Sequence, residues 1–244
     1  MHNHYRNRIY SNYVNARNTA LTSKTLEDLI TCGPYLERLI RHHFPANRSA
    51  TIIDLGCGQG AIIHFARLAG YTNVRGVDGS GEQIEAAKRL GIDGVEYGDL
   101  LETLTTLQDA SHDCIVTFDV IEHFTKDELI TIVDEIRRVL KPSGRWIIHA
   151  PNGESPFAGR ILFGDFTHEL AFTRTSIAQL LYSSGFSDVR SYEDEPIPHG
   201  VKSLIRWTLW KCIRGGLRLF LAVETGDSGR EAIFSQNFLT VALK

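Results

Sequence analysis

The chain has 244 residues, of which 43% are hydrophobic and 23% charged, and its formal net charge is −3. These values are typical of one large globular domain, and the small net charge provides no overall attraction for nucleic acid. The four cysteines form no CxxC pair, which excludes a zinc-finger or disulfide framework. The first residues lack an apolar signal segment, and no run of about 20 apolar residues predicts a transmembrane helix. We therefore expect a cytoplasmic protein with reduced thiols.

The first 47 residues precede the regular part of the chain. Residues 1–24 are polar and rich in Asn, Arg and Tyr, and they predict an extended arm or a short helical lid. Residues 25–44 have apolar side chains at helical spacing, interrupted near Gly33-Pro34. We therefore divide the chain into an N-terminal arm and helical lid (1–47) and one larger domain (48–244).

Strand and helix patterns alternate from residue 50 onward. Apolar runs at 50–55, 74–77, 94–97, 114–118 and 146–150 predict buried strands, and a strongly periodic helix is expected at 126–140. A further helix is expected at 175–184, a strand at 188–192 and a closing strand at the C-terminus. Such alternation is typical of an α/β fold with a parallel sheet covered on both faces.

Two stretches interrupt this alternation, at 151–174 and at 196–234. Both are expected to be irregular. Long loops within compact domains are uncommon and are often functional. We expect these two insertions to determine which substrate is bound.

The sharpest motif is Asp54–Gly60 (DLGCGQG), which lies between the first strand and its helix. Glycine allows tight turns and close approach of a ligand, and the helix that follows offers unpaired N–H groups. Asp78 stands 20 residues after Gly58 and ends the second strand, where a carboxylate can accept both ribose hydroxyls. Asp99 follows the third strand and can accept from an adenine amine. The alternatives are a helix N-cap for Asp78 and a turn residue for Asp99.

These motifs, with TFDVIEHF and LKPSGRWIIHAPN, resemble class I S-adenosylmethionine (SAM)-dependent methyltransferases over about residues 48–152. Small-molecule O-methyltransferases, including those of quinone biosynthesis, are the most similar group. The resemblance implies a Rossmann-like, doubly wound seven-stranded sheet, mostly parallel with an antiparallel last strand and helices on both faces. It also implies SAM as the cofactor. An NAD dehydrogenase is disfavoured, because Ala61 stands where GxGxxG requires glycine.

The resemblance assigns the methionine part of SAM to the glycine turn, the ribose to Asp78, and the adenosine and the floor of the site to residues further along. The cofactor-binding residues expected in this way are Asp54, Gly56, Cys57, Gly58, Gly60, Asp78, Gly79, Gln83, Asp99, Leu100, Phe118 and Asp119. Arg17 in the N-terminal arm is expected to pair with the SAM carboxylate, although solvated tail residues are the alternative.

Methyl transfer requires an aligned acceptor, exclusion of water and often removal of a proton. His123, just past the fourth strand, and His168, in GDFTHE, are the candidate bases, with Asp165 expected to orient His168. A structural role is the alternative for both histidines. His149 and Asn152, at the end of the fifth strand, are weaker candidates.

No metal is expected, because Asp119 and Glu122 are near each other in sequence but no third acid accompanies them. The segment around His168 resembles a D-x-T-H…F-T signature of sugar- and glycan-modifying members. We therefore expect O-methylation of a sugar or glycan-linked acceptor in polysaccharide biosynthesis. The alternatives are a quinone, a phenol or another small metabolite, and a non-catalytic SAM-binding module. A nucleic-acid partner is not expected.

Residues 201–223 combine basic, aromatic and aliphatic side chains and contain no acid. On a helix, Lys211, Arg214 and Arg218 would share one side, and Gly215-Gly216 would break the helix. This segment predicts peripheral contact with the inner face of a membrane or with a lipid-linked acceptor. A lid helix packed on the domain and a homodimer contact are the alternatives.

Overall fold

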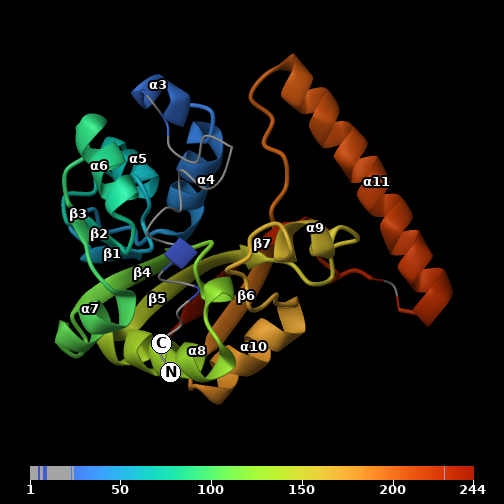
Figure 1. Cartoon of the computed structure of the whole chain (residues 1–244). Helices are drawn as coiled ribbons and strands as arrows, with labels where there is room; N and C mark the ends of the chain where they lie inside the picture. Colours follow the sequence, from blue (N-terminus) through green and yellow to red (C-terminus); the bar gives the residue numbers. More distant parts are fainter. Residues whose placement is uncertain (1–4, 6–7, 10–22, 24, 228) are drawn as a thin grey trace.

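The computed structural model describes residues 5, 8–9, 23, 25–227 and 229–244, which form a seven-stranded sheet with helices on both faces (Figure 1). The strand order is β3-β2-β1-β4-β5-β7-β6. The pairs among the first five strands are parallel, and β7 is antiparallel to both β5 and β6. The predicted fold class is confirmed, including the antiparallel last strand. The strands are β1 (Ile52–Leu55), β2 (Val74–Asp78), β3 (Val95–Tyr97), β4 (His112–Phe118), β5 (Leu140–Pro151), β6 (Asp188–Glu193) and β7 (Asn237–Leu243).

The helices fall into two layers, each with its own apolar core. One core joins the sheet to α7, α8 and α10, and the other joins it to α4, α5 and α6. Apolar side chains along β1 alternate between them, with Ile53 in the first core and Ile52 in the second. The helices in these layers are α4 (Gly33–His43), α5 (Ala61–Leu68), α6 (Gly81–Arg89), α7 (Leu100–Thr106), α8 (Lys126–Val139) and α10 (Arg174–Ser183).

The described part of the N-terminal segment packs into the second core. Helix α3 (Leu26–Leu29) ends before α4 begins at Gly33, so the interruption expected at Gly33-Pro34 is observed. Leu36, Leu39 and Ile40 of α4 are buried together with residues of β1 and α5. This helix therefore helps to fix the sheet edge where the site is expected, while the division of the chain at residue 47 remains a prediction.

The order in which strands are added reverses between β1 and β4. The chain places β2 and β3 on one side of β1 and then returns to place β4 on its other side. The helix after β1 covers one face of the sheet and the helix after β4 covers the other. A crevice therefore opens between the carboxyl ends of these two strands. The glycine turn follows β1, and the TFDVIEHF motif follows β4 through the short 3-10 helix η1 (Ile121–His123). The topology therefore brings both motifs to one edge.

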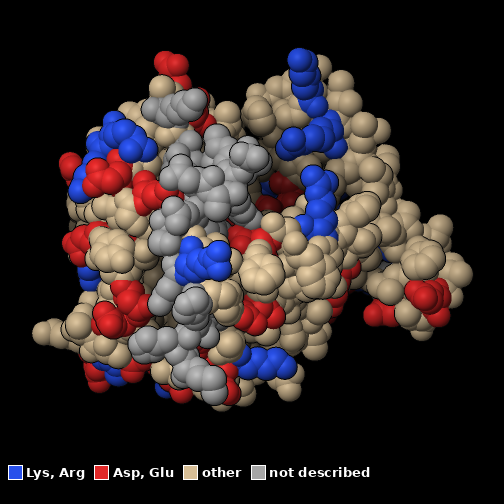
Figure 2. All heavy atoms as spheres, in the orientation of Figure 1, with Lys and Arg blue, Asp and Glu red and all other residues tan. Residues whose placement is uncertain are grey.

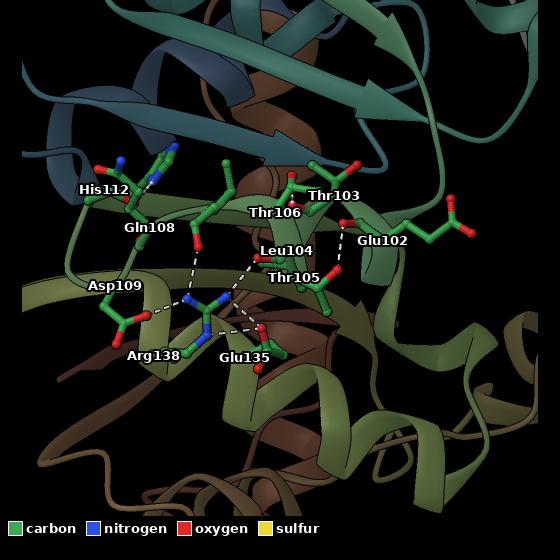
Figure 3. A network of polar contacts seen from close by, with 12 residues as sticks. Glu102, Thr103, Leu104, Thr105, Thr106, Gln108, Asp109, His112, Glu135 and Arg138 are labelled. Carbon is green, nitrogen blue, oxygen red and sulfur yellow. Dashed lines mark hydrogen bonds and ion pairs between the residues drawn. The ribbon is translucent and has the colours of Figure 1, made fainter.

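Arg138 secures the opposite edge of the sheet. Its guanidinium donates to the main-chain oxygens of Leu104 and Leu107, each at 2.8 Å, and to the carboxylates of Asp109 and Glu135 (Figure 3). The Leu104 carbonyl also accepts from the Leu107 amide at 3.1 Å, so Arg138 adds a second donor there and satisfies the carbonyl of Leu107 at the end of α7. A single side chain of α8 therefore closes α7 and holds the loop that leads into β4.

The stretch 196–234 was expected to be irregular, and that prediction is wrong for residues 201–225. Helix α11 (Val201–Thr225) is continuous over 25 residues and runs through Gly215-Gly216 without a break. It extends away from the sheet (Figure 1), and Ser203 is its one buried residue. No helix among the described residues combines the length and apolar character needed to cross a membrane. The other insertion, 151–174, contains the short helix α9 (Ala158–Leu162).

Candidate active site

The glycine turn after β1 has the backbone conformation that its sequence predicts. Gly56, Gly58 and Gly60 have φ angles of 75°, 53° and 84°, in the left-handed region that favours glycine. A Cβ on Gly56 would lie 2.4 Å from a methyl group of Val120, so no side chain fits there. The turn leads directly into α5, whose N-cap is Gly60 and has no side-chain cap. Main-chain groups are therefore left facing the crevice.

Asp78 ties this turn to the end of β2. Its Oδ2 accepts from the Gly58 amide at 2.7 Å, and its Oδ1 accepts from the Ser80 amide at 2.8 Å. Burial raises the pKa of Asp78, and these two amides act against that shift. Each oxygen retains a second lone pair, so the carboxylate can both brace the turn and accept from ligand hydroxyls.

Asp54 is a buried acid at the base of the turn. The residue is 1% exposed, and its Oδ1 has no hydrogen-bond partner among the described residues. Burial and the neighbouring Asp78 raise its pKa to about 8. Ser80 Oγ and Gln83 Oε1 are likewise buried without a partner in the described part of the chain.

These orphaned atoms fit SAM. A buried carboxyl suits the α-ammonium group of its methionine part, and the hydroxyl and amide oxygens suit the nucleoside. Two neighbouring acids, Asp54 and Asp78, favour a positively charged ligand over the pyrophosphate of a dinucleotide. The glycine turn, Asp54 and Asp78 are therefore the residues that would hold the cofactor, which supplies a methyl group on a sulfonium.

The remaining predicted cofactor residues surround this crevice. Cys57 is buried beneath the turn against Gly76, and Gly79 lies next to the main chain of Gly98. Asp99 accepts from the Glu102 amide at 3.0 Å and is the N-cap of α7, of which Leu100 is the first residue. Capping is a structural role for Asp99, and its contact with adenine remains a prediction. Arg17 lies outside the described residues.

Phe118 ends β4, Asp119 follows it, and both contact the buried imidazole of His149. Asp119 has a φ angle of 54°, and its Oδ1 lies 2.6 Å from Nδ1 of His149 on β5. The ring of Phe118 stacks on that imidazole at a centroid distance of 3.9 Å. Asp194 lies 3.4 Å from Nε2 of His149 and bonds Tyr35. Burial alone would lower the pKa of His149, but the two carboxylates raise it to about 10, so this histidine is an imidazolium at neutral pH.

His149 was only a weak candidate from sequence, and Tyr35 and Asp194 were missed. The position of His149 near the end of a parallel strand was the one available signal. Tyr35 lies on α4 and Asp194 just after β6, so their pairing depends on contacts between distant segments. A cavity of about 360 Å³ adjoins this network between α4, β6 and β7, with Tyr35, Arg38, Tyr192 and Glu195 in its wall.

The two predicted bases, His123 and His168, are brought together. Their ring centroids are 4.8 Å apart, with the planes at 69°. Thr167 Oγ1 donates to Asp165 at 2.7 Å and lies 2.9 Å from Nδ1 of His123. A hydroxyl has one proton, so Thr167 accepts from His123 Nδ1–H, and Nε2 of His123 is the unprotonated nitrogen. Burial, followed by the neighbouring His168, lowers the pKa of His123 to about 4.

Asp165 was expected to orient His168, and the structure shows it bonded to Thr167. Its carboxylate bonds the amide and hydroxyl of Thr167, and through Thr167 it orients His123. His168 is oriented by the carbonyl of Ile161, which accepts from Nδ1 at 3.1 Å. Asn152 is structural, since its amide donates to the main chain of Ile233 and Ser235.

Two points of the N-terminal segment touch this edge. Ser23 donates from its amide to Gln59 Oε1 at 2.8 Å and accepts from Gln59 Nε2 at 3.0 Å, beside the glycine turn. Tyr5 bonds Glu169 and meets Phe166 edge to face. These contacts place Ser23 beside the cofactor residues and Tyr5 beside the loop that contains His168.

Comparison with known proteins agrees with this geometry. Residues 53–148 match the family model described as a methyltransferase domain, and no curated protein sequence matches the chain. A SAM-dependent methyltransferase from Archaeoglobus fulgidus is 20% identical, with 89% of this chain and 97% of that one covered and a TM-score of 0.66. At such identities the likeness concerns the fold alone.

A possible histamine N-methyltransferase from Thermotoga maritima is 16% identical, with 97% of this chain and 99% of that one covered and a TM-score of 0.60. A Haemonchus contortus phosphoethanolamine N-methyltransferase, solved with S-adenosylhomocysteine and phosphomonomethylethanolamine, is 18% identical, with coverages of 86% and 52% and a TM-score of 0.59. The match over residues 53–148 identifies a methyltransferase domain, the solved structures share its fold, and the crevice residues fit SAM as the cofactor.

Proposed function

We propose that the protein methylates a hydroxyl group of a sugar, on a glycan or glycan precursor used in polysaccharide biosynthesis. The pair of imidazoles at the sheet edge, His123 and His168, supports this proposal most directly. Both have Nδ1 committed to a hydrogen bond, so Nε2 is the nitrogen able to take a proton from a hydroxyl. An amine acceptor with a neutral lone pair has less need of such groups.

Different segments of the chain bind the cofactor and position the histidines. The glycine turn, Asp54 and Asp78 hold the cofactor, and the loop 164–170 supplies His168 and, through Thr167, the orientation of His123. Alignment of the acceptor and removal of its proton each contribute to the rate. Phe166, two residues before His168 in this loop, is 81% exposed and offers an apolar ring to an acceptor.

A phenol or quinone is the second candidate acceptor. Phe157 and Phe163 are 64% and 84% exposed, and three exposed phenyl rings in one insertion favour an aromatic acceptor as much as a sugar ring. The proton chemistry is the same in both cases. A non-catalytic SAM-binding module is the third candidate.

We also propose that α11 contacts a membrane surface at its cytoplasmic side. Its outward face is apolar, and the exposed members of this stripe are Val201, Ile205, Leu209, Ile213, Leu219, Phe220 and Val223. Lys202 and Arg206 border the stripe and favour anionic headgroups, and Figure 2 shows basic side chains where α11 begins. All four cysteines are free thiols, as a reducing compartment allows.

Lys211, Arg214 and Arg218 share the other side of α11, as the helical spacing predicted. Lys211 pairs with Glu195 at 2.7 Å, Arg214 pairs with Glu193, and Arg218 donates to the Arg230 carbonyl. These three cations therefore stabilise the position of α11, and lipid phosphates would meet only Lys202 and Arg206.

Transfer of a labelled methyl group tests the acceptor. The purified protein and methyl-labelled SAM are added to a cell extract that is then separated into sugar, lipid and protein fractions. Label on carbohydrate, released by acid as an O-methyl sugar, is the expected result. Label on an extractable phenol or quinone would replace the first candidate with the second. Absence of label from every fraction, with SAM binding intact, would favour the non-catalytic module.

A further inference from the structure

Glu122 is a buried acid whose pKa is raised by burial. The residue is 1% exposed, and neither carboxylate oxygen has a hydrogen-bond partner among the described residues. Its main-chain oxygen accepts from the amides of Glu169 and Leu170, so the loop that contains His168 is held against it. A buried carboxylate without a partner is costly, and proteins place such groups where a cation or proton compensates them.

Two imidazoles lie beside this carboxylate. One ligand atom each from Glu122, His123 and His168 lies within 4.8 Å of the other two. Three atoms this close share a point no more than about 2.8 Å from each of them, whereas normal metal–nitrogen and metal–carboxylate distances are about 2.0–2.2 Å. A small side-chain adjustment would therefore complete the coordination.

The hydrogen bonds behind the histidines are those of a metal site. Nδ1 of His168 donates to the Ile161 carbonyl, and Nδ1 of His123 donates to Thr167, which in turn bonds Asp165. Ligating histidines generally donate their other N–H to a carbonyl or a carboxylate, which fixes the tautomer. Here the contacts leave Nε2 as the lone-pair nitrogen of both rings.

We propose that Glu122, His123 and His168 bind one divalent ion of borderline hardness, with Zn²⁺ the best match. Two imidazoles and one carboxylate are a known catalytic zinc set, while Mg²⁺ prefers oxygen ligands. The sequence expectation of no metal considered acids alone and did not include the two histidines.

The ion's role rests on the proposed function. With the ion bound, Nε2 of both histidines would be a ligand and would no longer accept the proton. An acceptor hydroxyl at an open coordination position would therefore lose its proton to solvent, and the ion would make that loss easier. The oxygen then forms the bond to the methyl group as the methyl–sulfur bond breaks, and S-adenosylhomocysteine leaves. Metal binding itself requires neither SAM nor an acceptor.

Metal titration of the full-length, tag-free protein tests the site. After removal of metal with a chelator, Zn²⁺ is added in competition with a chromophoric chelator, and Co²⁺ binding is followed by its visible absorption. We expect one equivalent of Zn²⁺ per chain and much weaker binding of Mg²⁺. Glu122→Gln and His168→Ala should each weaken Zn²⁺ binding more than tenfold. Thr167→Val, which keeps the shape but removes the hydroxyl, should weaken it by about 10- to 100-fold.

His199→Ala is the matched control, because it removes an exposed imidazole elsewhere and should bind Zn²⁺ as the unmodified chain does. Circular dichroism and S-adenosylhomocysteine affinity establish that each variant is folded. Folded variants with unchanged Zn²⁺ affinity would overturn the site, as would an unmodified chain that binds no Zn²⁺. Because these measurements use no acceptor, they fail or succeed independently of methyl transfer.

Discussion

The imidazole of His149 lies 2.6 Å from the carboxylate of Asp119, at the point where β4 and β5 reach the carboxyl edge of the sheet. His149 is 3% exposed, whereas the Asp119 side chain is 47% exposed. The histidine therefore depends on this carboxylate and on Asp194 to remain charged. The pair also holds Asp119 in its left-handed conformation beside the crevice.

His149→Gln should destabilise the protein by about 2 kcal/mol at pH 7, below the range for a fully buried ion pair because Asp119 is half exposed to water. The folded-state pKa of His149 is raised to about 10, above its ordinary value of 6.5. Its contribution to stability is therefore complete below about pH 6.5 and is lost as the pH rises through 10. Urea unfolding at pH 6.5, 8 and 10 measures both effects, and equal pH dependence in the two proteins would contradict the assignment.

Asp54 should release a proton when the cofactor binds. Burial and Asp78 raise its pKa to about 8, so the carboxyl is protonated at pH 7, and an ammonium ligand would favour its ionised form. Affinity for S-adenosylhomocysteine should therefore fall as the pH drops below 8, by up to about tenfold per unit. Calorimetry in two buffers of different ionisation enthalpy measures the proton. Asp54→Asn should abolish the release, and Asp99→Asn should retain it.

Asp78→Ala should weaken cofactor binding by about 1–3 kcal/mol, the range for lost charge-assisted hydrogen bonds. The substitution also removes the acceptor for the Gly58 and Ser80 amides, so the turn itself loses support. Asp78→Asn keeps one oxygen and should have a smaller effect. Equilibrium dialysis with labelled S-adenosylmethionine gives both affinities, and unchanged values would remove Asp78 from the cofactor site.

His168→Ala should reduce turnover roughly 100-fold or more, whether the imidazole takes the proton itself or holds an ion that promotes its loss. Affinity for S-adenosylhomocysteine should stay the same, because the ring of His168 bonds the loop carbonyl of Ile161 and, among the described residues, none of those expected to bind the cofactor. His199→Ala is the control. Full turnover in His168→Ala would transfer the chemical role to other groups at the sheet edge.

Vesicle sedimentation tests the surface proposed on α11. The unmodified protein should sediment with vesicles that contain phosphatidylglycerol and much less with neutral ones, since Lys202 and Arg206 border the apolar stripe. A double substitution, Leu209→Ser with Ile213→Ser, should reduce binding at least tenfold. Ile130→Ser is the matched control, because Ile130 is exposed on α8. Self-association that this double substitution abolishes, without any vesicle binding, would assign the stripe to a second copy of the chain.

The sequence predicted those elements whose pattern is local. The run Ile52–Leu55 followed by glycines, and the periodic helix of Leu129, Ile132 and Ile136, bury their apolar residues as the spacing required. Helix α11 was missed because Lys202 and Arg206 do not share one side with the other three cations and Gly215-Gly216 suggested a break. On its basic side, Lys211 pairs with Glu195 and Arg214 with Glu193. Hydrophobic periodicity cannot predict these ion pairs.

The residues of the site also differ in how far the sequence alone could predict them. Asp54, the glycine turn and Asp78 lie next to strand ends, so strand prediction alone brought them together. His123 and His168 were both found, but their contact depends on how the loop 164–170 packs on Glu122. Tyr35 and Asp194 meet His149 from α4 and from the segment after β6, and only the folded sheet joins these three segments.

The guanidinium of Arg138 has a wider consequence. Lysine would preserve the charge there but not the planar set of donors that meets two carbonyls and two carboxylates. Arg138 therefore stabilises the junction of α7, α8 and the loop before β4, at the edge of the sheet opposite the predicted site. Substitutions around Arg138 should thus alter how much folded protein a cell retains, rather than the speed of each catalytic cycle.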